Sequence, residues 1–411
     1  MGLREDAGRI VREAIDSVLP GPAVMRAVQD MRFAPEGRVI LIAVGKAAWD
    51  MAASALEALP VPVDSGMVIT KYGHARGMLK NLEIREAGHP VPDENGYRAT
   101  ARALELVKGL SAGDTVLFLL SGGGSALFEA PLVPPEEMEE ITRSLLSSGA
   151  DIKEINTVRK RLSAVKGGRF ALACAPAKVK CVILSDVLGD RIDTIASGPA
   201  CPDDTTCTQA QDVIARYGIR LSCDAERLIK QETPKRVDNA EHIVIGSVRQ
   251  LCEAAAAACR ELGYETKILE TDVCCEAREA GRRLACEAVA RQSTSSGKHA
   301  LVMGGETVVK VMGKGLGGRN QELALAAAFE IDGRDGLCVF SVGSDGTDGP
   351  TDAAGGYADG STAEKLRAQD IDIKDVLVQN DSYHALKAVD GLIVTGPTGT
   401  NVNDVSVALI G

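Results

Sequence analysis

The sequence predicts an α/β protein with mainly parallel sheets, and two patterns carry that prediction. Short runs rich in Val, Ile and Leu, such as 38–45 and 115–120, are apolar throughout instead of alternating. Such runs are typical of strands buried on both faces. Longer helical patterns separate them, and one of these, 248–263, ends at a glycine. Because 411 residues exceed one ordinary core, we expect two α/β domains, the first of them Rossmann-like.

The remaining expected strands follow in order at residues 181–187, 242–247, 299–305, 337–345 and 391–396. The first 19 residues mix acidic and basic residues from the fourth position and lack the apolar core of a signal peptide. We therefore expect an amphipathic helix there. A polar stretch at 232–241 contains a proline and precedes a new strand, so we divide the chain into domains 1–235 and 236–411. The C-terminal run after residue 391 belongs to the second domain or returns to the first.

Composition excludes several classes of function. The net charge of −11 disfavours nucleic acid or an anionic membrane as the main partner. No stretch of eighteen apolar residues occurs, so no membrane span is predicted and we expect a cytoplasmic protein. The eleven cysteines form no C-x-x-C pair, which indicates reduced core cysteines and no zinc site.

Glycine-rich and basic residues follow two of the predicted strands. The loop Ser121, Gly122, Gly123, Gly124 and Ser125 comes directly after 115–120. Its backbone N–H groups can surround an anion, since glycine lets the chain approach a ligand closely. Lys46 follows 38–45 at an expected helix start, where a cation suits an anionic ligand, although the segment is not a Walker A loop. The alternatives are an ordinary turn and a solvated lysine.

A second glycine-rich segment, 312–322, formally contains G-x-G-x-x-G. A strand is expected before it, at 307–312, and a helix after it, so the context of a dinucleotide fingerprint is partly met. Arg319, Asn320 and Glu322 at the helix start are candidate polar ligand contacts. A planar Arg319 can clamp a phosphate or carboxylate.

Two acidic loops complete the candidate site. Residues 184–199 carry Asp186 at a strand end and Asp190 beyond it, and residues 343–356 carry Asp345, Asp348 and Asp352. Mg²⁺ takes one or two carboxylates together with substrate phosphates, so Asp186 and Asp345 are candidate metal ligands. The alternative for each aspartate is a helix cap or a turn.

The sequence suggests no Ser-His-Asp order and no cysteine chemistry. His89 lies in a loop beside a proline, where a histidine more often has a structural role. The residues alone therefore indicate an α/β enzyme with two glycine-rich anion sites, a lysine, an arginine and acidic metal-ligand candidates. That set is typical of phosphoryl transfer, in which positioning and charge neutralisation carry most of the catalysis.

Six long motifs in order resemble the glycerate 2-kinases of the MOFRL type: FLLSGGGSALFEAP, EINTVRKRLSAVKGGRFA, LSDVLGDRIDTIASGPACPDDTT, GGETVVKVMGKGLGGRNQELALA, GSDGTDGPTDAAGGYAD and TGPTGTNVNDVSVALIG. The resemblance implies transfer of the γ-phosphoryl group of ATP to the 2-hydroxyl of D-glycerate with Mg²⁺. It also implies two α/β domains with the active site in the cleft between them. The family's functional lysine and arginine fall on Lys46 and Arg319. Substrate- and nucleotide-binding residues are expected within the same motifs: Ser121, Gly122, Gly123, Gly124, Ser125, Glu306, Gly315, Gly317, Asn320, Glu322, Thr347, Thr400 and Asn401.

In the expected mechanism, the loop 122–125 holds nucleotide phosphates or the glycerate carboxylate, and Lys46 and Arg319 neutralise the transferred group. Asp190, with Asp345 second, is the candidate acceptor of the substrate hydroxyl proton. The alternatives are an NAD(P)H-dependent hydroxypyruvate reductase, a kinase specific for the 3-hydroxyl, and a non-catalytic sensor of sugar acids or nucleotides. A homodimer is possible for any of them.

Overall fold

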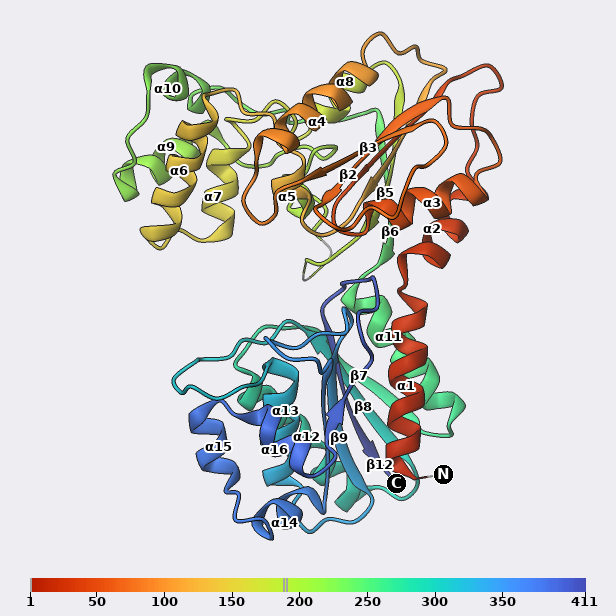
Figure 1. Cartoon of the computed structure of the whole chain (residues 1–411), viewed down its shortest axis with the longest axis vertical. Coiled ribbons are helices and arrows are strands. Elements are labelled where there is room, and N and C mark those ends of the chain that lie inside the picture. The colour runs from red at the N-terminus through yellow and green to blue at the C-terminus, as the bar shows by residue number, and fades with distance from the viewer. Residues whose placement is uncertain (1, 188, 190) are drawn as a thin grey trace. The chain divides into compact units, whose positions relative to one another are not determined.

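The chain divides into two compact units in a computed structural model that describes residues 2–187, 189 and 191–411. The unit called the first domain here comprises Pro20–Ser185 and Arg191–Ile245. The second domain comprises Met1–Leu19, Asp186–Asp190 and Gly246–Gly411. Figure 1 shows the elements of both units. The prediction of two α/β domains is confirmed.

The first domain is built on a sheet in the order β3-β2-β1-β4-β5-β6. This is the strand order of the Rossmann fold, and the pairings of β1 with β2 and β4, of β2 with β3, and of β4 with β5 are all parallel. The strands are β1 (Val39–Val44), β2 (Ser65–Lys71), β3 (Leu82–Ala87), β4 (Thr115–Leu120), β5 (Lys178–Leu184) and β6 (Ala240–Gly246). The helices are α2 (Pro20–Val28), α3 (Ala48–Ala58), α4 (Glu94–Leu106), α5 (Gly124–Leu127), α6 (Pro135–Ser147), α7 (Ile152–Arg159), α8 (Arg169–Cys174), α9 (Cys207–Tyr217) and α10 (Cys223–Ile229), with a 3-10 turn η2 (Ile195–Ser197).

The sequence forms this sheet because its central strands can be buried completely. All six residues of β1 and of β4 are buried, as their continuous apolar runs predict. Phe118 of β4 packs against Phe128 and Phe170, with ring centroids 5.6 and 4.6 Å away. A separate apolar cluster joins α6, α7, α9 and α10 beside the sheet.

The second domain contains a mixed sheet in the order β11-β10-β9-β12-β8-β7. Its strands are β7 (Glu265–Val273), β8 (His299–Gly305), β9 (Leu337–Gly343), β10 (Gly355–Asp359), β11 (Leu392–Ile393) and β12 (Asp404–Ile410). Its helices are α1 (Leu3–Ser17), α11 (Val248–Glu261), α12 (Ala277–Thr294), α13 (Arg319–Glu330), α14 (Thr362–Arg367), α15 (Ile373–Gln379) and α16 (Ser382–Ala388). β7 and β8 pair in parallel, whereas β12 is antiparallel to β8 and β9. This sheet is mixed, whereas the sequence predicted mainly parallel sheets. A strand buried on both faces is apolar throughout whether its neighbours are parallel or antiparallel, so its sequence does not indicate its direction.

The domain limits also differ from the predicted ones, for physical reasons. The strand expected at 242–247 as the first strand of the second domain is β6, which lies next to β5 as the edge strand of the first sheet. The N-terminal helix α1 is amphipathic, and it packs on α11 and β9 of the second domain. There, Tyr264 donates a hydrogen bond to the buried Asp6 at 2.7 Å. The C-terminal strand β12 lies inside the second sheet and does not return to the first domain.

The strand expected at 307–312 does not form, and this is a correction to the sequence analysis. Beyond an isolated bridge between Val308 and Glu276, the segment is a loop. The backbone N–H groups of Met312 and Gly313 donate to Oδ1 of Asn380 instead of to a neighbouring strand. Val311 is 76% exposed, so the apolar residues of this segment are not explained by burial in a sheet.

Over the described residues, no helix is long and apolar enough to cross a membrane.

Candidate functional site

The first candidate centre lies where the strand order of the first sheet reverses, between β1 and β4. In open α/β sheets, ligands bind beyond the carboxyl ends of the strands at this switch point. Lys46 follows β1, and the loop 121–125 follows β4. The backbone N–H of Lys46 donates to the carbonyl of Gly122 at 2.9 Å, and that of Ala47 donates to Oγ of Ser121 at 3.1 Å. The two predicted motifs are therefore in contact.

Glycine is required where these strand ends meet. Gly45 has φ +123°, and a Cβ atom there would lie 2.2 Å from Oγ of Ser121. Gly123 has φ +87°, and its Cβ would lie 2.9 Å from Cδ2 of His89 and 3.4 Å from Cγ of Lys46. A side chain at either position would separate the loop from its neighbours.

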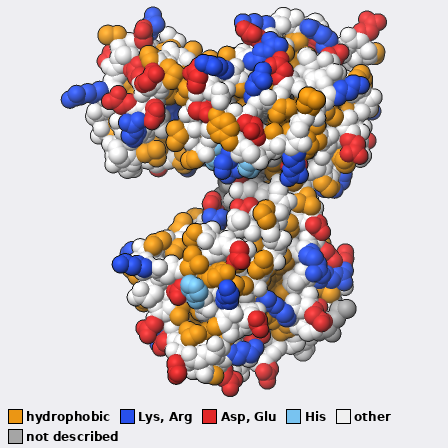
Figure 2. Space-filling view, viewed as in Figure 1, with side chains coloured by type: hydrophobic (Ala, Val, Ile, Leu, Met, Phe, Trp, Pro, Cys, Tyr) orange, Lys and Arg blue, Asp and Glu red, His pale blue; other side chains and the backbone are white. Residues whose placement is uncertain are grey.

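The centre offers unpaired positive and hydrogen-bond-donating groups. Among the described residues, none accepts a hydrogen bond from the backbone N–H groups of 122–125, and none pairs with Nζ of Lys46. Burial, together with the charges of Lys46, Lys71 and His74, lowers the pKa of His89. Histidine side chains lie beside basic ones on this domain (Figure 2). The local field therefore favours an anion although the whole chain is acidic.

A buried lysine and a partly buried arginine hold the far end of the glycine loop. Nζ of Lys166 donates to the carbonyl of Ser125 at 2.9 Å, and Nη2 of Arg159 donates to the same oxygen at 3.2 Å. Oγ of Ser125 lies 3.1 Å from Oγ of Ser197, which donates to Oδ1 of Asn156 at 3.0 Å. Lys166 is fully buried, and burial lowers its pKa to about 8. These positioning contacts were missed, because "VRKRL" and "VKGGR" look like solvated basic stretches in the sequence.

The second candidate centre lies at one edge of the second sheet. β8 and β9 end there, and β12 begins there, with Asp404 opposite both Gly305 and Gly343. Arg319, the first residue of α13, donates from Nε to Oδ2 of Asp404 at 2.6 Å and from Nη2 to Oδ1 at 3.0 Å. Nη1 donates to Glu306 at 2.8 Å. The guanidinium is thus held by two carboxylates.

Burial determines the charge properties of this pair. It raises the pKa of Asp404 to about 6, against the opposing effect of Arg319. Burial also opposes the charge of Arg319, but Asp404 and Glu306 outweigh it and raise the pKa of the guanidinium. The Asp404 side chain is 7% exposed and that of Arg319 is 31% exposed, so the arginine keeps one side open to a ligand.

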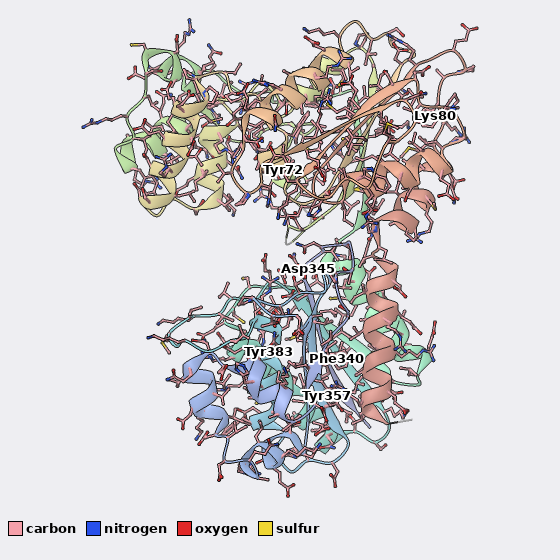
Figure 3. All side chains as sticks on the ribbon, viewed as in Figure 1. Tyr72, Lys80, Phe340, Asp345, Tyr357 and Tyr383 are labelled. Atoms are coloured by element: carbon pink, nitrogen blue, oxygen red, sulfur yellow. The ribbon has the colours of Figure 1, made fainter. Side chains whose placement is uncertain are left out.

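The three aspartates of 343–356 have three different environments. Asp348 is buried and accepts from the backbone N–H groups of Asn320 and Gln321, which caps α13; burial raises its pKa. Asp352 accepts from the hydroxyl of Tyr383 at 2.8 Å. Asp345 lies beyond the end of β9 (Figure 3), where its Oδ1 accepts from the backbone N–H and the hydroxyl of Thr347. A Cβ on Gly343 would lie 3.4 Å from Oδ1 of both Asp345 and Asp404, which places these carboxylates together.

Several other predicted residues hold the second domain together. Asn320 and Glu322 are buried; Glu322 accepts from Nε of Arg278 at 2.6 Å and from Asn380 at 3.1 Å. Gly315 and Gly317 pack closely against 379–382, where a Cβ would meet atoms at 2.5 and 2.1 Å. These contacts explain their residue types without a ligand.

The remaining predicted residues lie in connections. The Thr400 hydroxyl is buried and donates to the carbonyl of Val18 at 2.8 Å, while Oδ1 of Asn401 accepts from the backbone N–H of Asn403. The carbonyl of Asp186 accepts from Nδ2 of Asn403 at 3.1 Å. Asp190 lies outside the described residues.

The residues present fit Mg²⁺ only if a substrate supplies further ligands. Across the described residues, no group of three His, Cys, Asp or Glu side chains could hold a metal ion by itself. Asp345 offers a carboxylate with one oxygen already bonded to Thr347, and Asp404 lies near it. Mg²⁺ commonly uses one or two carboxylates with phosphate oxygens, so this donor set suits an ion that arrives with a nucleotide.

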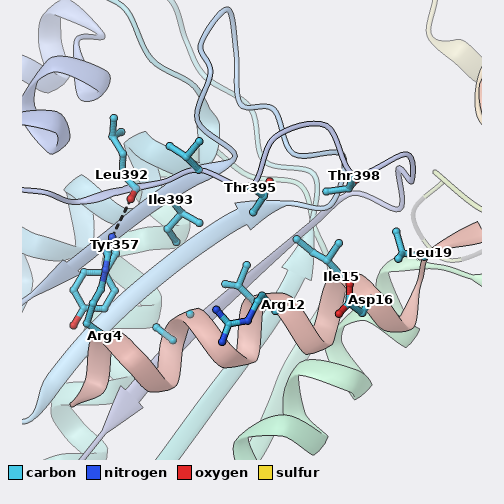
Figure 4. A pocket seen from close by; sticks show the side chains of 14 residues that line it. Arg4, Arg12, Ile15, Asp16, Leu19, Tyr357, Leu392, Ile393, Thr395 and Thr398 are labelled. Carbon is cyan, nitrogen blue, oxygen red and sulfur yellow. Dashed lines mark hydrogen bonds between the residues drawn. The ribbon is translucent and has the colours of Figure 1, made fainter. Parts of the chain in front are cut away.

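A cavity of about 690 Å³ lies between α1 and the β11 edge of the second sheet (Figure 4). Its lining includes Arg4, Ile15 and Ile393, and Arg4 donates to the carbonyl of Leu392 at 2.9 Å. None of the predicted site residues lines it.

The Rossmann-type switch point and the anchored arginine define a two-domain α/β protein with a candidate anion-binding centre in each domain. Residues 6–230 match the model of a domain of unknown function, DUF4147, and residues 299–404 match that of the MOFRL family. A D-glycerate 2-kinase of Thermotoga maritima is 53% identical over 413 residues, which cover 99% of this chain and 98% of that protein. The crystal structure of a glycerate kinase from Thermotoga maritima has a TM-score of 0.96 at 52% identity and covers 100% of this chain and 99% of the other. An Agrobacterium vitis protein named as a hydroxypyruvate reductase is 40% identical, over 99% of this chain and 94% of its own. The chain belongs to the MOFRL-type glycerate kinase family.

Proposed function

We propose that this chain is a kinase that transfers the γ-phosphoryl group of ATP to the 2-hydroxyl of D-glycerate. The observation that carries the proposal is the contact of Lys46 with the loop 121–125 at the switch point, where Nζ of Lys46 and the N–H groups of 122–125 have no partners among the described residues. A relative named D-glycerate 2-kinase, 53% identical over almost the whole chain, supports the same reaction.

Each side chain has a role that follows from charge. The N–H groups of 122–125 bind oxygens of a nucleotide phosphate or of the substrate carboxylate. Lys46 neutralises charge that develops on the transferred phosphoryl group, and Arg319 does the same once Asp404 has fixed its orientation. Asp345 and Asp186 would hold Mg²⁺, which supplies further neutralisation of the phosphates. Of the proton acceptors expected from the sequence, Asp190 lies outside the described residues, and Oδ1 of Asp345 is already bonded to Thr347.

The reductase alternative has weaker support. It depends on the G-x-G-x-x-G match at 313–318, but a loop precedes this match where the fingerprint needs a strand. Its glycines pack closely against Gln379, Asp381 and Asp348. The name of the Agrobacterium vitis relative is what still favours it.

One pair of assays separates the two readings. Purified protein with Mg²⁺ and ATP is expected to form ADP only when D-glycerate is added, and to leave NADH and NADPH unoxidised in the presence of hydroxypyruvate. Oxidation of either nicotinamide, without ADP formation, would contradict the proposal. We also propose a cytoplasmic location and a homodimer, which fractionation and the solution mass would test.

A further inference from the structure

His89 occupies the glycine-loop centre although the sequence favours a structural role for it. The residue follows β3, and its imidazole edge lies over Gly123, with Nε2 3.1 Å and Cδ2 2.9 Å from the Cβ position of that glycine. Cγ of Lys46 lies 3.4 Å from the same position. The ring is half-buried, and among the described residues neither ring nitrogen has a hydrogen-bond partner.

The charged and titratable groups that face His89 come from the ends of two strands, β1 and β2, and from its own loop. Lys46 follows β1, Lys71 ends β2 and His74 follows β2; each disfavours a positive charge on the ring. Asp93, on the loop of His89, accepts from the Tyr72 hydroxyl at 2.6 Å and from the backbone N–H groups of Gly88 and Gly96. Burial and these basic neighbours lower the pKa of His89 and so favour its uncharged form.

The carboxylates around this centre are already engaged. Asp93 is bonded to Tyr72, which Figure 3 labels. Glu86 accepts from the backbone N–H of Ala75 at 2.9 Å, and Asp50 pairs with Arg76 at 3.0 Å. Of the two histidines at this centre, His74 already contacts the carbonyl of Lys46 through Nδ1 at 3.0 Å, whereas His89 has no hydrogen-bond partner among the described residues.

We propose that His89 is a catalytic residue that accepts the proton of the substrate hydroxyl during phosphoryl transfer. The inference rests on the proposed kinase function. As the hydroxyl O–H bond breaks, its proton moves to the lone pair of Nε2, the nitrogen that faces the glycine loop. The hydroxyl oxygen bonds to the γ-phosphorus, the bond from that phosphorus to the β,γ-bridging oxygen breaks, and ADP leaves with the electron pair. The imidazolium then releases the proton to water. Burial and the basic groups around the ring suit this role, because both disfavour the imidazolium, which favours a ring that can accept the proton and then release it.

The test compares H89Q with D190N, because Asp190 is the acceptor that the sequence suggests. We expect H89Q to lower kcat by about 10²- to 10⁴-fold, the usual contribution of a general base, and to leave the dissociation constant of ATP unchanged. Its kcat should also lose the acidic limb of the pH profile, whereas D190N should keep that limb. H384Q, at an exposed histidine of the second domain, is the matched control and should retain wild-type kinetics.

Three results would overturn the proposal. One is an H89Q enzyme that keeps the acidic limb, and another is a loss confined to KM or to ATP binding, which would make His89 an anion contact. The third comes from the unaltered enzyme and requires no variant to fold: the NMR titration of the His89 ring should give the pKa of the kinetic limb, and a clear mismatch excludes the residue. A wild-type enzyme with no ADP formation would instead refute the kinase function itself, so the two failures are distinguishable.

Discussion

Arg319 and Asp404 form a two-pronged ion pair, with Nε–Oδ2 and Nη2–Oδ1 distances of 2.6 and 3.0 Å. The pair joins the first residue of α13 to the first residue of β12, which are 85 residues apart in the sequence. Because Asp404 is buried and the arginine is partly exposed, the carboxylate orients the guanidinium, and the guanidinium remains available to a ligand.

Asp404→Asn should therefore reduce turnover without preventing folding. The amide cannot accept two charge-assisted hydrogen bonds, so Arg319 loses its fixed direction, and misplacement of a catalytic group by about 1 Å can cost about 10²-fold in rate. Steady-state kcat and a thermal melt measure the two effects. Asp332→Asn is the matched control, since Asp332 makes a similar two-pronged pair with Arg367 elsewhere in the domain. Equal losses of kcat in both variants would contradict the assignment.

Lys46→Met should remove activity and leave stability unchanged. Its Nζ has no partner among the described residues, so the substitution breaks no native ion pair. Loss of one charge-stabilising group typically lowers kcat by about 10²- to 10³-fold. Lys80→Met, at an exposed lysine (Figure 3), controls for the loss of charge. A Lys46→Met enzyme with near-wild-type kcat would remove this residue from the mechanism.

Gly123→Ala separates backbone strain from loss of function. The positive φ costs an alanine about 1–2 kcal/mol, and its Cβ would also lie 2.9 Å from Cδ2 of His89, so that the ring would have to shift. Gly109→Ala has a similar φ of +67° with no atom within 4 Å of the new Cβ. Denaturant unfolding should show a stability loss for both variants that is at least as large for Gly123→Ala, and kinetics should show loss of turnover for Gly123→Ala alone. If Gly123→Ala is fully active, the loop is not a close-fitting anion site.

Asp114 should contribute to the acid stability of the first domain. Arg38 and the backbone N–H of Ser111, with donor–acceptor distances of 2.9 and 2.7 Å, lower the pKa of its carboxyl. A lowered carboxyl pKa stabilises the fold above the unfolded-state pKa of about 3.9, and that stability is lost as the pH falls below it. Asp114→Asn should thus cost about 1–2 kcal/mol at neutral pH, with the difference shrinking in acid. Asp238→Asn, at an exposed carboxylate, should show no such trend; a pH-independent difference for Asp114→Asn would contradict this interpretation.

The sequence predicted four strands that are buried on both faces, although it missed β2, whose five central residues are also buried. β1, β4, β8 and β9 are fully buried, and their apolar runs mark them clearly. β3 and β7 escaped the analysis because they are largely half-exposed and carry polar residues. The direction of β12 could not be predicted, because a continuous apolar run is compatible with both parallel and antiparallel neighbours when the strand is buried on both faces.

The candidate site was predictable where each of its segments directly follows a strand that the sequence itself indicates. Lys46 and 121–125 both come after buried strands, and parallel strands bring their carboxyl ends to one edge. Asp404 and His89 were missed for different reasons. Asp404 reaches its arginine because β12 runs antiparallel, and His89 reaches Gly123 through a loop whose path no local pattern specifies.

The identity of the phosphorylated product tests the central claim most directly. The protein would be incubated with Mg²⁺, ATP and D-glycerate, and residual ADP would be removed enzymatically. Enolase, pyruvate kinase and lactate dehydrogenase would then be added. Immediate pyruvate formation, without phosphoglycerate mutase, is the predicted result, because enolase accepts 2-phosphoglycerate. Pyruvate that appears only after the mutase is added would make the 3-hydroxyl the acceptor, and the absence of any phosphorylated product would contradict the kinase assignment.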